Sequence, residues 1–247
     1  MNANRKKQVV LLLLVVVIAG LMAVMAGGAA AQNGPPNPPV LPPVANAFGM
    51  TYGEWAIAWW QWAGTVEVEN LNDHPLVADG EMDCSLGQDG KVWFLGGTFG
   101  HEATGTADRE CDVPVGKALF FPMVNIICSP LTSDPDDAEF LLACAINPGD
   151  VYGFELGMSP LSVSIDGVEI PNLDYYYVEP GVTFDIGPVP DPNIFYADEG
   201  AVEQAATTGY YLLLPPLSKG DHTIAFEAEV TGDYPSYYDI TYLLHVK

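Results

Sequence analysis

The segment TYGEWAIAWWQWAG, residues 51–64, constrains the fold most, because it holds four of the five tryptophans of the chain. Thr51 can cap a helix, and Glu54 stands three residues later, where a capping box requires an acidic or amide side chain. Gly64 is a suitable stop signal for that helix. The pattern therefore predicts a helix over 51–64.

The tryptophans of this helix can form a ligand platform or part of the core. At helical spacing Trp55, Trp59 and Trp62 share one face, whereas Trp60 points elsewhere. A helix that is apolar almost all round is usually buried, and each tryptophan can bury on the order of 200 Å². We therefore expect most of the rings in the core. Trp60 is the expected exception, and with its neighbour Gln61 it is a candidate ligand contact.

The N-terminus has the organisation of a secretory signal peptide. A basic start is followed by an apolar run over residues 9–26, and Ala29 and Ala31 match the A-x-A cleavage pattern. Cleavage after Ala31 makes residues 1–31 the signal peptide of an exported protein, located outside the cell, in the periplasm or at the cell surface. The alternative is an uncleaved membrane anchor, because the apolar run is near the lower length limit of a spanning helix.

The charge balance is strongly acidic, with a formal net charge of −24 at pH 7. Three of the eight basic residues lie in the N-terminal segment, whereas all 32 acidic residues lie beyond it. Such a surface is a poor partner for nucleic acid and anionic membranes, so membrane contact is expected only through an uncleaved N-terminal segment. Solubility explains the charge without a metal. Binding of a cation, usually Ca²⁺ outside cells, is the alternative.

Four cysteines lie beyond the N-terminal segment, and an even count in an exported chain indicates disulfides. Three pairings are possible. We expect the nearest-neighbour pairs, Cys84–Cys111 and Cys128–Cys144, because each disulfide would close a single loop between cysteines that are adjacent in the sequence. Metal binding by these cysteines is not expected, since no C-x₂-C pair is present.

A proline-rich arm and a series of β-prone runs make up most of the remaining chain. Residues 32–49 should be extended, since their prolines cannot continue a helix. In the run 117–127, Pro122 indicates an edge strand or a bulge, and Asp166–Gly167 is a strong two-residue hairpin signal. We therefore expect an all-β single domain over 50–247, a jelly-roll-like β-sandwich with two short helices and the tryptophan helix at one end or edge.

The second helix is predicted over 135–146, with Asp134 as its N-cap and Pro135 as its first residue. Capping explains the acidic cluster here without calcium, because an EF-hand loop needs glycine at its sixth position, where Glu139 stands. The other candidate calcium ligands lie in one expected loop, and they are Asp191, Asp198 and Glu199.

No established catalytic motif is present. The chain lacks a P-loop and a nucleophile elbow, and its four histidines show no metal-ligand spacing such as H-E-x-x-H. A Ser–His–Asp arrangement or a pair of glycosidase carboxylates can still be assembled in space. The candidate catalytic residues are Glu54, whose capping role is the simpler explanation, and His101 in a glycine-rich stretch. Arg109 is a further candidate for ligand binding.

Three long motifs are W-x-x-x-W-W-Q-W from Trp55, G-x-V-W-F-L-x-G-T-F-G from Gly90, and R-x-C-x-V-P-x-G-K-A-L-F-F-P from Arg109. Together with L-S-x-G-x-H-T-I from Leu217, they resemble an uncharacterised family of exported bacterial and archaeal β-rich proteins. The resemblance covers most of 50–247 and leaves the arm outside. It implies an exported, disulfide-bonded domain of mostly β structure, and it carries over no catalytic residue.

These observations favour a non-catalytic exported protein without a cofactor, which binds glycans or cell-envelope components or has a structural role. One alternative is a secreted hydrolase acting on polysaccharide or another polymer, with Glu54, Gln61, His101 and Arg109 near one cleft. Another is an extracellular filament subunit whose arm adds a strand to a neighbour, although prolines make poor ladder partners. An enzyme should gather titratable residues around one pocket, whereas a sugar binder should expose an aromatic strip.

Overall fold

The computed structural model describes residues 40–99 and 105–247. The expected signal peptide, the first part of the proline-rich arm and the candidate catalytic residue His101 therefore lie outside the described residues. All described residues belong to one compact unit.

Two patterns of burial divide the long strands into two groups. In β3 (Thr106–Val113), β11 (Gly220–Gly232) and β12 (Ser236–Val246), buried residues largely alternate with more exposed ones, as in a sheet with one face toward water. In β4 (Ala118–Cys128) and β10 (Glu203–Leu214), long runs are buried without alternation. The second pattern indicates a sheet that is covered on both faces.

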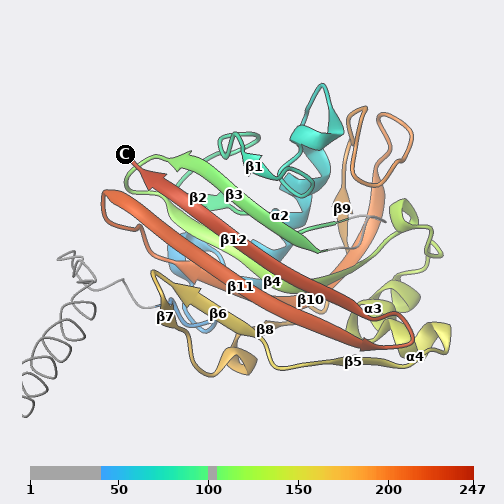
Figure 1. Cartoon of the computed structure of the whole chain (residues 1–247). Coiled ribbons are helices and arrows are strands. Elements are labelled where there is room, and N and C mark those ends of the chain that lie inside the picture. Colours follow the sequence, from blue (N-terminus) through green and yellow to red (C-terminus); the bar gives the residue numbers. More distant parts are fainter. Residues whose placement is uncertain (1–39, 100–104) are drawn as a thin grey trace, which may run out of the picture. The chain divides into compact units, whose positions relative to one another are not determined.

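The strands form a seven-stranded and a five-stranded sheet (Figure 1). The first has the order β1 (Gly80–Glu81), β3, β12, β11, β6 (Ser162–Ile165) and β7 (Val168–Glu169), with β5 (Leu156–Met158) beside β11. The second has the order β2 (Val92–Phe94), β4, β10 and β8 (Tyr177–Val178), with β9 (Phe184–Ile186) beside β10. Strand β3 runs parallel to β12, and β2 runs parallel to β4, whereas β11–β12 and β4–β10 are antiparallel.

The predicted turn and bulge are both present. Asp166 and Gly167 join β6 to β7, and both have positive φ, as a two-residue hairpin turn requires. Strand β2 pairs only with Ala118–Phe120 of β4, so at Pro122 the paired neighbour is β10 alone. The register with β10 also shifts around Met123, because Tyr211 faces Pro122 and Tyr210 faces Val124. This bulge accommodates the residue that cannot donate a ladder hydrogen bond.

The five-stranded sheet is the middle of three layers. On one face, Phe120 and Tyr211 pack against helix α2 (Tyr52–Thr65). On the other face, Phe121 and Leu212 pack against the seven-stranded sheet. The expected β-sandwich is therefore confirmed. The tryptophan helix does not lie at one end or edge, because the apolar outer face of the middle sheet needs a cover.

Helix α2 begins as the sequence predicts. The Thr51 hydroxyl accepts a hydrogen bond from the Glu54 amide at 3.2 Å, and the Glu54 carboxylate accepts one from the Thr51 amide at 2.7 Å. These two bonds form the predicted capping box. The short 3₁₀ segment η1 (Ala47–Gly49) precedes the helix, and η2 (Leu71–Asp73) follows it.

The expectation that Trp60 is the exposed tryptophan is wrong. Trp59 and Trp60 are each 1% exposed, and Trp55 is the least buried of the four. The Trp60 ring lies 4.9 Å from that of Trp59, and Phe99 and Phe195 pack on it from outside the helix. Helix α2 is therefore buried on more than one side. The sheet covers one side, and Phe99 and Phe195 cover the side that carries Trp60.

The second helix is present but begins three residues later than predicted. Helix α3 (Ala138–Ile146) is capped by Asp137, whose carboxylate accepts the Phe140 amide at 2.8 Å. Asp134 does not cap it, because its carboxylate accepts hydrogen bonds from the preceding turn, from the Ser129 amide and the Thr132 hydroxyl, each at 2.8 Å.

A third helix, α4 (Pro148–Tyr152), follows α3, and η3 (Pro130–Thr132) and η4 (Leu173–Tyr176) complete the short elements. Both expected disulfides, Cys84–Cys111 and Cys128–Cys144, are confirmed. The second joins α3 to the end of β4. No helix within the described part of the chain is long and apolar enough to cross a membrane.

We expect Trp60→Ala to lower the free energy of unfolding by about 3–5 kcal/mol, because the substitution leaves a cavity in the core. Urea unfolding followed by far-UV circular dichroism measures the loss. The matched control is Tyr196→Ala, since Tyr196 is 72% exposed and its loss should cost less than about 0.5 kcal/mol. A cost for Trp60→Ala as small as that of the control would contradict the core role.

Candidate functional site

The three predicted hydrolase residues that the structure describes do not converge on one cleft. Glu54 is exposed, and its pKa is lowered by the hydrogen bonds from the Thr51 amide and hydroxyl, as its capping role requires. Gln61 is exposed on the same helix, and its side chain donates to the Asp185 carbonyl at 3.1 Å. Arg109 belongs to the other sheet and is 2% exposed. The hydrolase arrangement therefore lacks support among the described residues.

Arg109 holds backbone in place through Nε and Nη1, whereas its buried Nη2 has no hydrogen-bond partner among the described residues. Its Nε donates to the Ala78 carbonyl at 2.8 Å, and its Nη1 donates to the carbonyls of Gly96 and Gly97 and to the Tyr242 hydroxyl. The guanidinium also lies 5.4 Å from the centre of the Tyr242 ring. Because these contacts join two separate segments, at Ala78 and at Gly96–Gly97, to the seven-stranded sheet, we assign Arg109 a structural role.

His74 is a second buried polar group in this region. Its Nδ1 accepts the Leu76 amide at 3.1 Å, so its Nε2 carries the proton and donates to the Ala63 carbonyl at 3.0 Å. Burial lowers the pKa of His74 to about 4, and the nearby Arg109 charge acts in the same direction. His74 is therefore neutral at physiological pH and links the end of α2 to the following loop.

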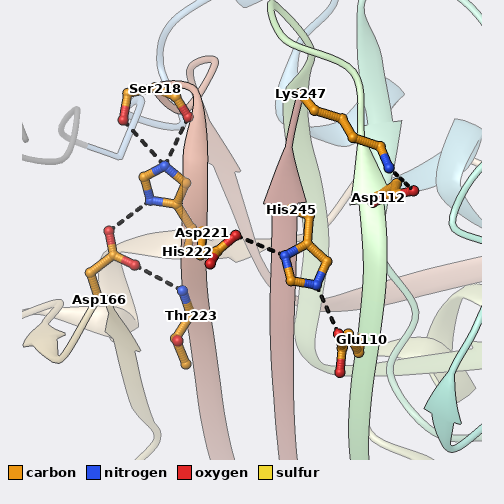
Figure 2. Close-up of polar contacts among 9 residues, drawn as sticks. All are labelled: Glu110, Asp112, Asp166, Ser218, Asp221, His222, Thr223, His245 and Lys247. Carbon is orange, nitrogen blue, oxygen red and sulfur yellow. Dashed lines mark hydrogen bonds and ion pairs between the residues drawn. The ribbon is translucent and has the colours of Figure 1, made fainter.

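A Ser–His–Asp contact does exist, and Figure 2 shows its geometry. His222 Nε2 lies 3.2 Å from Ser218 Oγ, and Nδ1 lies 2.8 Å from Asp166 Oδ2. However, Nε2 also lies 2.9 Å from the Ser218 carbonyl oxygen. A carbonyl oxygen cannot donate to Nε2 and competes with the hydroxyl for that nitrogen, whereas a general base needs a lone pair directed at the serine hydroxyl. The contact joins the β6–β7 turn to the turn before β11.

His245 bridges three strands on the outer face of the seven-stranded sheet (Figure 2). Its Nδ1 lies 2.8 Å from Asp221 on β11, and its Nε2 lies 2.8 Å from Glu110 on β3. The hydrogen bonds to Asp221 and then to Glu110 raise the pKa of His245, because both carboxylates favour the charged imidazolium. This histidine therefore stabilises the sheet when it is protonated.

A hollow of about 750 Å³ lies beside β1 and β3, and we name it the Cys84 groove after the disulfide at its side. Five carboxylates line it, against the single ammonium group of Lys247, which pairs with Asp112. The polar lining also includes the Asn72 amide and the Ser85 hydroxyl, and Trp93 and Met82 are among its apolar residues. The acidic lining residues are Asp73, Asp79, Glu81, Asp83 and Asp112.

Covalent and polar contacts hold the frame of the Cys84 groove. The Cys84–Cys111 disulfide ties the groove loop to β3, and the Met82 amide donates to the Glu110 carbonyl at 2.9 Å. Asp79 accepts the Asp108 amide at 2.8 Å, so its carboxylate serves the frame. By contrast, the carboxylates of Asp73 and Glu81 have no hydrogen-bond or ion-pair partner among residues 40–99 and 105–247. These two oxygen pairs are open to a ligand.

The candidate calcium ligands are only partly brought together. Asp191 and Glu199 line a hollow of about 610 Å³ with Glu67 and Glu69, whereas Asp198 does not line it. Within the described residues, the group whose ligand atoms all lie within 4.8 Å of one another is Cys128, Asp134 and Cys144. Its two cysteines are joined in a disulfide. The loop acids therefore do not form a compact ligand set.

Sequence reasoning missed the Cys84 groove because its lining comes from four separate parts of the chain. These are the segment 72–86, Trp93 on β2, residues 112–114 at the end of β3, and Lys247 just after β12. A signal was present in the acidic run around Cys84, but only the parallel pairing of β3 with β12 places Lys247 beside it.

We expect His245→Gln to lower the free energy of unfolding most at low pH. The folded-state pKa of His245 is raised, so its stabilising effect is complete below the unfolded pKa near 6.5 and is lost as pH rises through the folded pKa. Urea midpoints of wild type and variant between pH 5 and pH 9 measure the difference. Lys219→Gln is the control, because Lys219 is exposed and takes no part in the bridge between His245, Asp221 and Glu110. A difference that grows with pH would contradict the assignment.

Comparison with known proteins adds no assignment. No family model matches the chain, and a search of curated proteins finds no match. The motif resemblance to exported bacterial and archaeal proteins thus stays a prediction, and any assignment of function depends on the geometry of this chain.

Proposed function

We propose that this chain is an exported, non-catalytic protein that binds an extracellular glycan or another hydroxyl-rich envelope polymer in the Cys84 groove. Its two disulfides fit the oxidising environment that an exported protein meets. The observation that carries the proposal is the lining of the groove, where open carboxylates, an amide, a hydroxyl and apolar side chains meet in one hollow.

The chemistry of this lining suits a sugar. Carboxylates accept hydrogen bonds from hydroxyl groups, and such charge-assisted bonds are stronger than neutral ones. The open carboxylates of Asp73 and Glu81 can accept without breaking an existing bond. Apolar side chains such as Met82 can meet the C–H surface of the same ring. Since disulfide and backbone bonds hold the frame, little ordering entropy is lost on binding.

The described titratable clusters favour binding over catalysis. Glu54 caps α2, and Arg109 holds backbone carbonyls. His222 Nε2 lies nearer to the Ser218 carbonyl oxygen than to the Ser218 hydroxyl, so the contact is not arranged as a general base on that serine. Each group has a structural partner that explains its position.

The filament alternative gains no support from the edges of the five-stranded sheet. At one edge, the Gln88 side chain pairs with Phe94 as a strand would, accepting its amide at 2.9 Å and donating to its carbonyl at 2.7 Å. On the other side of the sheet, β10 continues past the short edge strand β8, and there the Leu41 amide of the arm donates to the Leu213 carbonyl at 2.9 Å. The described end of the arm thus pairs with its own sheet, and the positions it occupies are closed to a neighbour.

We expect Asp73→Asn combined with Glu81→Gln to weaken glycan binding at least tenfold, because hydrogen bonds to charged groups contribute about 1.5–3 kcal/mol each. A glycan array identifies the ligand, and titration calorimetry measures the affinity. The melting temperature should not fall, since neither carboxylate has a partner in the folded chain.

Glu227→Gln, on the outer face of the seven-stranded sheet, is the matched control and should bind like wild type. A product assay on the same polymers accompanies the titration. Turnover of any polymer would show that the protein is an enzyme, and unchanged affinity of the double variant would remove the groove as the site.

A further inference from the structure

Four tyrosines lie at the β8 edge of the five-stranded sheet as two pairs of neighbouring rings. They come from η4, β8 and β10. The rings of Tyr175 and Tyr176 lie 5.4 Å apart, and those of Tyr177 and Tyr210 lie 5.2 Å apart across paired strands. We name this surface the tyrosine strip, and its members are Tyr175, Tyr176, Tyr177 and Tyr210.

The strip differs from the tyrosines of the core. Tyr175 is 53% exposed and Tyr177 is 38% exposed. Among the described residues, none of the four phenol hydroxyls of the strip has a hydrogen-bond partner. In the core, by contrast, Tyr52 and Tyr242 donate to the carbonyls of Leu41 and Gly96. The strip therefore presents ring surface and unused hydroxyl groups at the same place.

The charges around the tyrosine strip disfavour a negatively charged partner. Asp174 precedes the three consecutive tyrosines, and its carboxylate, after burial, raises the pKa of Tyr210. Glu179 follows β8, and residues 172–180 contain no basic side chain. A polyanion would therefore meet only like charge, both locally and from the acidic chain as a whole.

We propose that the tyrosine strip is a contact surface for a neutral glycan chain. It shares no residue with the Cys84 groove and is a separate site. Tyrosine rings offer a flat apolar face to the C–H side of a sugar ring, and they lose little conformational entropy on binding. The free phenol hydroxyls and the Asp174 carboxylate supply hydrogen bonds to the sugar hydroxyls along the same surface.

Native affinity electrophoresis tests the site with neutral and anionic polymers cast in the gel. The neutral probes are mixed-linkage β-glucan, xyloglucan and galactomannan, and the anionic probe is polygalacturonate. Wild type should be retarded by at least one neutral polymer and not by polygalacturonate. Tyr175→Ala combined with Tyr177→Ala should weaken retardation at least tenfold, and the matching double phenylalanine variant should fall between the two.

The matched control is Tyr196→Ala combined with Tyr234→Ala, because these tyrosines are 72% and 69% exposed and lie outside the strip. This variant should migrate like wild type. Thermal melting checks that every variant is folded, and Tyr175→Ala alone serves if the double variant melts early.

The groove variant separates this inference from the proposed function. If the Asp73→Asn and Glu81→Gln variant loses retardation while the strip variant keeps it, the strip is not a glycan site and the groove proposal stands. Equal retardation by polygalacturonate would overturn the neutral class. Wild type that no neutral polymer retards, but that a protein partner captures through Tyr175 and Tyr177, would overturn the glycan assignment.

Discussion

The fold depends on the indole N–H groups of helix α2, each of which is bonded to a different part of the chain. Trp55 donates to the Ala47 carbonyl before the helix, and Trp62 donates to the Leu86 carbonyl beside the Cys84 groove. Trp59 donates to the Leu95 carbonyl after β2, and Trp60 donates to the Thr207 hydroxyl on β10. A buried indole N–H without a partner is costly, so these bonds fix the position of the helix as well as its depth.

With α2 in place, the five-stranded sheet is covered on both faces, and the outer face of the seven-stranded sheet is left to water. That face carries charged side chains such as Asp221 and Glu110. His245 bridges these two carboxylates across three strands. The interior instead contains polar groups whose partners are backbone atoms, such as Arg109 and His74. Polar residues on the outer face therefore stabilise the sandwich through ion pairs, whereas buried polar residues do so through hydrogen bonds to backbone atoms.

The two proposed contact surfaces lie where this arrangement leaves polar groups unused. In the Cys84 groove, Asp73 and Glu81 have no partner among the described residues, whereas neighbouring acids such as Asp79 serve the frame. In the tyrosine strip, the hydroxyls of Tyr175 and Tyr177 are likewise open. The sequence predicted Trp60 as the exposed exception because helical spacing points it away from the face that Trp55, Trp59 and Trp62 share. Most of the exposed aromatic residues in the described part of the chain are tyrosines, since the tryptophans of α2 cover the middle sheet.

Local chemistry explains what the sequence by itself determined. The capping box of Thr51 and Glu54, the Asp166–Gly167 turn, the bulge at Pro122 and both nearest-neighbour disulfides follow from residues close together in the chain. Only the tertiary structure decided the burial of Trp60, the parallel pairing of β3 with β12 and the residues that line the Cys84 groove. These depend on contacts between distant segments, such as Trp60 with Thr207. A local sequence pattern predicts where a helix or a turn begins. It does not predict which distant segment will pack against a given side chain.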